Sequence, residues 1–123
     1  MPWAEWAPYC QPTMGDAPND DLPGARELRA ALASPDPSIR ARAVLRAPPG
    51  PGVEPMMLAA LDDEDPEVRL ASVQALIRLG GPAATRAVMA AAARDPSPAV
   101  RAEALAGLAR ILQARRSGAR RPD

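Results

Sequence analysis

A five-residue pattern occurs three times along this chain and constrains its fold more than any other feature. Each copy has Asp or Ser, then Pro, a variable residue, an aliphatic residue and Arg. The first residue is of a type that caps helix N-termini, and proline at the first helical position costs no hydrogen bond. The copies therefore predict the starts of three helices, at residues 36–40, 65–69 and 97–101.

Apolar or small residues follow each copy at the spacing of one helix face. In the second and third copies they stand four, five, eight and eleven residues after the aliphatic residue. At about 100° per residue these positions form one stripe, which predicts two helices that bury Val68, Leu76, Val100 and Leu108. The first copy runs into a proline–glycine run at residues 48–52, so its helix is expected to end early.

A second amphipathic segment precedes each copy, so each unit is predicted to be a helix, a short turn and a capped helix. Alanines stand five residues before each cap, where two helices need small residues to approach closely. Residues 80–82, Gly-Gly-Pro, separate the second unit from the third. Asp95 and Pro96 offer a competing start for the third capped helix. The large apolar residues eight positions before the caps are expected to face inward; they are Leu28, Met57 and Met89.

These features resemble the HEAT-repeat family, particularly the short bacterial repeats of the phycobilisome-lyase-like type. The resemblance spans roughly residues 24–113, and the Asp-Pro-Glu-Val-Arg run at 65–69 carries most of it. It implies an all-α fold, a short α-solenoid of about three HEAT-like helical hairpins in a right-handed stack, with units at about 24–47, 53–80 and 82–113.

The resemblance also implies roles for the residues of the repeated pattern. In HEAT-like repeats the matching arginine usually bonds an aspartate or the backbone of a neighbouring unit, and arginine is suited to such partly buried pairing. The alternative is a row of arginines that binds anions. The structural repeat positions are Asp36, Arg40, Asp65, Arg69, Ser97 and Arg101.

The composition argues against catalysis and cofactor chemistry. The 123-residue chain has no histidine, which removes the usual proton-transfer group near neutral pH and the commonest metal ligand. Its one cysteine, Cys10, excludes an intrachain disulfide and a cysteine-based zinc site. The acidic run at residues 62–67 fits a helix N-terminus, with a bound cation as the alternative. We therefore expect no enzyme activity, no cofactor, no metal and no small-molecule substrate.

Charge and hydropathy argue against nucleic acid and membranes as partners. The 15 basic and 15 acidic residues balance, so no global field attracts nucleic acid or an anionic bilayer. No apolar run approaches the ~20 residues that cross a bilayer, and residues 1–22 lack the basic residues of a targeting signal. The prediction is a cytoplasmic protein, and the many Ala, Arg and Pro residues without Lys are typical of a GC-rich bacterial genome.

One candidate protein-binding site lies on the second helices. In resembling solenoids these helices line the concave surface, where partners commonly bind. A mildly basic strip on this surface would suit an acidic protein, and the alternative is an ordinary solvated face. The residues of this strip are Arg42, Gln74, Arg78 and Arg110.

The two ends of the chain offer the other candidate sites. Residues 1–22 are predicted to be an extended arm that holds every aromatic residue of the protein, Trp3, Trp6 and Tyr9. Such side chains are frequent binding anchors, and the alternative is that the arm covers the first unit. Residues 114–123 are expected to form a basic disordered tail, with nucleic-acid binding as the weaker alternative.

Together these observations predict a non-catalytic adaptor or accessory subunit that docks on a larger protein complex and stabilises it. The alternatives are a bilin lyase-like or chaperone-like factor, which only the repeat subtype suggests, and a nucleic-acid-binding HEAT-like protein. Because the core is poor in large side chains, we expect the isolated protein to have a free energy of unfolding of about 3–5 kcal/mol, which urea unfolding would measure.

Overall fold

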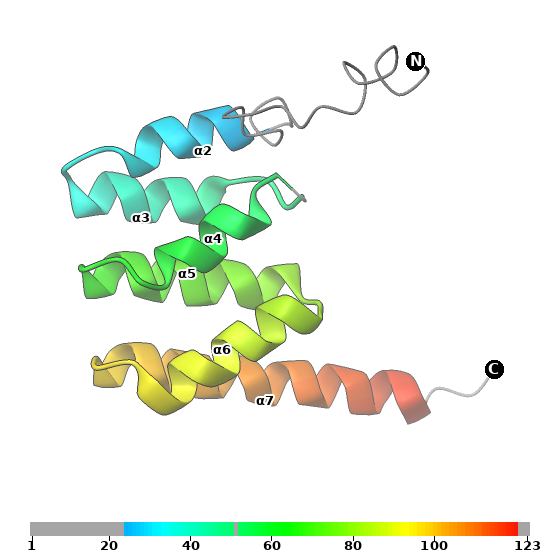
Figure 1. Ribbon diagram of the computed structural model, residues 1–123. Coiled ribbons are helices and arrows are strands. Elements are labelled where there is room, and N and C mark those ends of the chain that lie inside the picture. Colours follow the sequence, from blue (N-terminus) through cyan, green and yellow to red (C-terminus); the bar gives the residue numbers. More distant parts are fainter. Residues whose placement is uncertain (1–23, 51, 121–123) are drawn as a thin grey trace, which may run out of the picture.

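The computed structural model describes residues 24–50 and 52–120, which form a stack of helices without strands (Figure 1). The helices pair in chain order into three hairpins, and each hairpin lies beside the next, as the resemblance to an α-solenoid predicts. The second helices, α3, α5 and α7, run side by side down the stack. The helices are α2 (Ala25–Leu32), α3 (Pro37–Arg46), α4 (Glu54–Ala60), α5 (Pro66–Leu79), α6 (Pro82–Arg94) and α7 (Pro98–Arg120).

The second helix of each hairpin begins at the predicted proline. The Asp36 carboxylate accepts the Ser38 amide hydrogen at 2.9 Å, and the Asp65 carboxylate accepts the Glu67 amide hydrogen at 2.8 Å. In the third hairpin α7 starts at Pro98, and its first helical hydrogen bond reaches the Ser97 carbonyl. The competing start at Asp95 is not used. The helix starts were therefore predictable, because capping is a local interaction.

The core is a seam of small and medium aliphatic side chains between the hairpins. Val68, Leu76 and Val100 are buried as predicted, and Leu108 packs against the same seam while partly exposed. Ile39, which holds the corresponding position in the first unit, is 45% exposed. The α3 helix ends at Arg46, just before the proline–glycine run, as expected. At the end of α5, the positive φ angles of Gly80 and Gly81 turn the chain into the third hairpin.

The prediction that Met89 faces inward is wrong. Met89 is 54% exposed, and the neighbouring Val88 is fully buried in its place. In the second unit the Asp63 amide bonds the carbonyl three residues back, whereas in the third unit the Asp95 amide bonds the carbonyl four residues back. The first helix of the third unit thus ends at Arg94, one residue before its aspartate, whereas α4 ends three residues before Asp63. The inward residue of the third unit lies nine positions before the cap and not eight.

The expected disordered tail from residue 114 is also corrected, because α7 continues to Arg120. The segment between Gln113 and Pro122 consists mainly of Ala and Arg, which are favourable in helices, and it contains no proline. The side chains of residues 114–118 are all exposed. None of the described helices is both long enough and apolar enough to span a membrane.

Candidate protein-interaction surfaces

Two arginines of the repeated pattern tie each hairpin to the next. Arg40 on α3 donates from Nε and Nη2 to the two carboxylate oxygens of Asp63, both at 3.0 Å. Arg69 on α5 donates from Nε to the Asp95 carboxylate, also at 3.0 Å. The arginine side chains are only 12% and 11% exposed. These pairs are the arrangement that the resemblance implies, and they occupy two of the three arginines that an anion-binding row would need.

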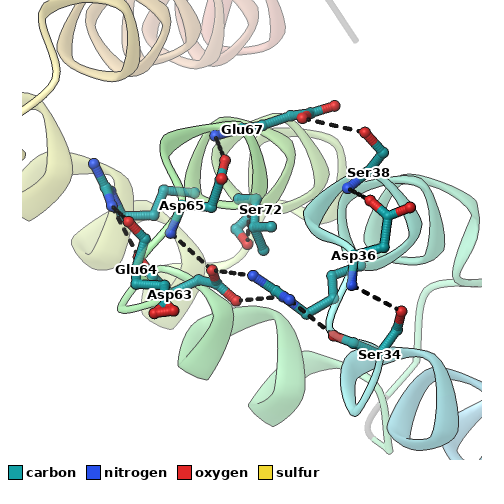
Figure 2. A network of polar contacts seen from close by, with 11 residues as sticks. Ser34, Asp36, Ser38, Asp63, Glu64, Asp65, Glu67 and Ser72 are labelled. Carbon is teal, nitrogen blue, oxygen red and sulfur yellow. Dashed lines mark hydrogen bonds and ion pairs between the residues drawn. The ribbon is translucent and has the colours of Figure 1, made fainter.

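The aspartate that pairs with an arginine also closes the partly buried turn between the two helices of its own unit. Asp63 accepts the Asp65 amide hydrogen at 2.9 Å, and Asp95 accepts the Ser97 amide hydrogen at 2.9 Å. In the first unit Ser34 fills this position and accepts the amide hydrogen two residues later at 3.1 Å. Figure 2 shows the turns of the first two units, with Asp63 facing the first unit. Serine completes the turn, but only aspartate also pairs with an arginine of the preceding unit.

The proposed basic strip on the second helices is divided in the structure. Arg78 donates through Nη2 to the Leu45 carbonyl at 2.8 Å, and Arg110 makes a long, exposed contact of 3.4 Å with Glu103. Arg42 is exposed and has no side-chain hydrogen bond within the described part of the chain, and Gln74 is partly exposed. Arg42 is therefore the strip residue that the fold leaves available.

A shallow groove of about 280 Å³ lies between α3 and α5 and brings Arg42 and Gln74 together. Its apolar part includes Leu45, which is 36% exposed, and Leu70. Glu67 and Ser38 line the same groove. The groove therefore offers the unpaired Arg42 guanidinium and the Glu67 carboxylate beside apolar contact area, which is suited to binding a protein side chain or helix.

Comparison with known protein families agrees with this repeating geometry. The family of HEAT repeats matches residues 25–109, from the start of α2 into α7. The chain belongs to the HEAT-repeat family. No curated protein and no solved structure matches it. The family match does not distinguish repeat subtypes, so the phycobilisome-lyase-like subtype stays a prediction. HEAT repeats are commonly protein-interaction modules and generally non-catalytic scaffolds.

A depression of about 720 Å³ lies between α4 and α6 of this HEAT-repeat protein. Its charged lining includes Asp63, Arg69 and Asp95, which are held in the contacts between hairpins. Within the described residues no group of three acidic, cysteine or histidine side chains is placed to hold a metal ion. Every buried side-chain nitrogen and oxygen described in the structure has a hydrogen-bond partner. The buried part of this depression therefore holds no unpaired polar side-chain atom, and the exposed side chains of Asp62, Glu64 and Arg94 also line it.

The Arg40–Asp63 pair changes the titration of both groups. Partial burial of the Asp63 carboxyl raises its pKa, but the hydrogen bonds from Arg40 and from the Asp65 amide, with the charges of Arg40 and Arg69, outweigh burial. The pKa of Asp63 is therefore lowered. The hydrogen bond to Asp63 is also the main reason that the pKa of Arg40 is raised.

Stability is expected to fall in acid as Asp63 becomes protonated. Its pKa is lower in the folded than in the unfolded protein, so its contribution is complete above the unfolded value of about 4 and is lost as the pH falls through the folded value. Urea midpoints measured against pH should show a shallower acid loss for Asp63→Asn than for the wild type. Asp62→Asn is the control, because it removes a carboxylate from the same turn and leaves the Arg40–Asp63 pair intact. Equal slopes for wild type and Asp63→Asn would contradict this prediction.

The aromatic candidates Trp3, Trp6 and Tyr9 lie outside the described residues. Leu105, which the sequence pattern placed on the buried stripe, is 59% exposed. Its amino-acid type gave no signal of exposure, because the same stripe is buried wherever another hairpin lies against it. Leu45, which the same pattern placed on the exposed side of its helix, is 36% exposed.

Proposed function

We propose that this HEAT-repeat protein is a non-catalytic interaction module, an adaptor or accessory subunit that docks on a larger protein complex and stabilises it. The observation that carries the proposal is the groove between α3 and α5, where exposed Arg42 and Leu45 lie side by side in its lining. The arginines of the repeated pattern serve the fold, whereas Arg42 has no role in it. A surface with unpaired charge and exposed apolar area is typical of a binding site.

An acidic partner surface suits this groove best. Arg78, an exposed arginine of α5, uses one guanidinium nitrogen for the Leu45 carbonyl and keeps further N–H donors. Arginine binds carboxylates through paired hydrogen bonds, and Leu45 supplies apolar contact area beside it. We infer that the partner presents a carboxylate next to an aliphatic side chain, as the face of an amphipathic helix does.

Charge reversal at Arg42 is expected to weaken partner binding roughly tenfold, which corresponds to about 1.4 kcal/mol, since it places a carboxylate where the partner presents one. Tagged full-length protein is incubated with extract of the source organism, and co-purified proteins are quantified by mass spectrometry. The Arg86→Glu variant is the matched control, because Arg86 is an exposed arginine on α6 in the other layer of the stack. A partner retained equally by Arg42→Glu and wild type would contradict the groove as the binding site.

The N-terminal arm is proposed to act as a tether, with its Trp side chains in pockets of the partner. The same co-purification is performed with a chain that begins at Asp20, and the partner's recovery is expected to fall. Equal recovery from the shortened and the intact chain would discard the tether and leave the groove unaffected.

A further inference from the structure

One side of α7 is exposed at Leu105, although the residues that correspond to Leu105 in the other units are buried. Leu105 follows Arg101 by four residues, as Val44 follows Arg40 and Val73 follows Arg69. Val44 and Val73 are fully buried, whereas Leu105 is 59% exposed. Along the same side of α7 lie Ala109, Leu112 and Arg116, which are all exposed. We call the residues Arg101, Leu105, Ala109, Leu112 and Arg116 the end face.

Arg101 is held in the orientation that its two counterparts use for pairing. Its Nη1 donates to the Asp95 carbonyl, six residues back, at 2.6 Å. Arg40 and Arg69 donate in the same way to the carbonyls six residues before them, both at 2.8 Å. Those two arginines also bond a carboxylate in the next unit's turn, but within the described residues Arg101 has no carboxylate partner.

The contact between α5 and α7 shows how the next hairpin of the stack packs against a face of this kind. Gly107 of α7 lies directly against the Ile77 side chain of α5. Ala109 holds the position in α7 that Ile77 holds in α5, nine residues after the aliphatic residue of the pattern. From Arg101 to Ala109 the end face therefore repeats the α5 pattern of Arg69, Val73 and Ile77, an arginine followed by aliphatic side chains along the helix.

We propose that the end face binds a helical hairpin of another protein that carries an aspartate in the turn between its helices, at the position that Asp63 and Asp95 hold here. The Arg101 guanidinium bonds this aspartate, and the apolar face of the hairpin covers Leu105 and Leu112. The surface is separate from the α3–α5 groove and adds a second contact to the proposed interaction module.

A second copy of this chain does not supply the required group. Stacked head to tail, it would present the turn of its first unit, where Ser34 stands in place of the aspartate. Paired through antiparallel α7 helices, it would bring Arg116 of one copy near Arg101 of the other, and like charges in contact are unfavourable. Charge complementarity therefore favours a partner hairpin with an acidic turn.

The full-length Ser34→Asp variant supplies the aspartate as a defined probe. Ser34 accepts the Asp36 amide hydrogen, a contact that Asp63 and Asp95 make in their turns, so the substitution fits the turn. In sedimentation velocity the wild type is expected to stay monomeric. The Ser34→Asp variant is expected to form head-to-tail oligomers whose mass rises with concentration, because a head-to-tail contact leaves both ends of each oligomer free.

Four further variants test whether the association uses the end face. Adding Arg101→Ala or Leu105→Glu to Ser34→Asp is expected to restore the monomer, and Ser34→Asn is expected to remain monomeric because an amide carries no charge. Adding Arg42→Glu should leave the oligomers unchanged, which separates this inference from the α3–α5 groove. Wild-type self-association that Leu105→Glu abolishes would place a second copy on the face and overturn the proposal.

A second measurement covers the case in which another part of the first unit hinders association. A copy of residues 80–113 is placed after Ile111, so that it follows α7 as the third unit follows α5. Arg101→Ala should then lower the urea midpoint more in the extended chain than in the natural chain, and replacing the copied aspartate with serine should remove that difference. A monomeric Ser34→Asp variant together with no such difference overturns the proposal.

Discussion

Replacing Arg69 with alanine is expected to lower the free energy of unfolding by about 3–5 kcal/mol, because it leaves the Asp95 carboxylate buried without its cation. The Asp95 and Arg69 side chains are only 5% and 11% exposed. The same substitution also removes the hydrogen bond to the Asp63 carbonyl. Since a core of this size supplies only about 3–5 kcal/mol, the variant should be largely unfolded without denaturant, which far-UV circular dichroism and urea titration would detect.

Arg101→Ala is the matched control for this prediction. Arg101 holds the same position in the repeat and makes the same carbonyl hydrogen bond, but it has no carboxylate partner in the described chain. Its removal should cost only about 0.5–1.5 kcal/mol, the usual net value of one hydrogen bond. Equal losses of unfolding free energy for the two variants would show that the Arg69–Asp95 pair adds no stability beyond the hydrogen bond from the arginine to the carbonyl of the turn.

The double variant Arg69→Ala with Asp95→Ala tests whether the loss comes from the pair itself. Removing both partners leaves no buried carboxylate, so the double variant should lose less stability than the sum of the two single variants. Additive losses would contradict a direct coupling between Arg69 and Asp95.

Enlarging Gly107 to leucine is expected to cost about 1–3 kcal/mol through overpacking. Even a Cβ atom at this position would overlap the Cδ1 and Cγ1 atoms of Ile77, so α5 and α7 would have to separate or Ile77 would have to move. Thermal unfolding followed by circular dichroism would report the loss. Because α5 and α7 pack along this contact, the loss should appear as a lower midpoint of the whole protein.

Two variants distinguish overpacking from a general effect of the substitution. Gly118→Leu places the same side chain on the same helix where no atom lies within 4 Å of the new Cβ, and it should stabilise slightly because leucine favours helices more than glycine does. Adding Ile77→Ala to Gly107→Leu should recover part of the loss by making room. A Gly107→Leu variant as stable as the wild type would show that this contact is not tight.

The sequence determined the features that depend on neighbours along the chain. Caps at Asp36 and Asp65 and the following prolines defined where helices start, and the proline–glycine run after Arg46 ended α3. These features depend on side chains within a few residues of one another, so the pattern alone was enough. The HEAT-repeat family followed from three such copies in register.

Tertiary structure decided which of the equivalent positions are buried and which groups are paired. The sequence placed Leu105 on the same stripe as Val73, but only the stacking shows that Val73 is buried in the core and that Leu105 is 59% exposed. Likewise, the pattern gave Arg40, Arg69 and Arg101 the same surroundings along the chain. Their different pairing arises because the aspartate comes from the turn of the next hairpin, 23 or 26 residues away, and a contact at that separation exists only once the hairpins have packed.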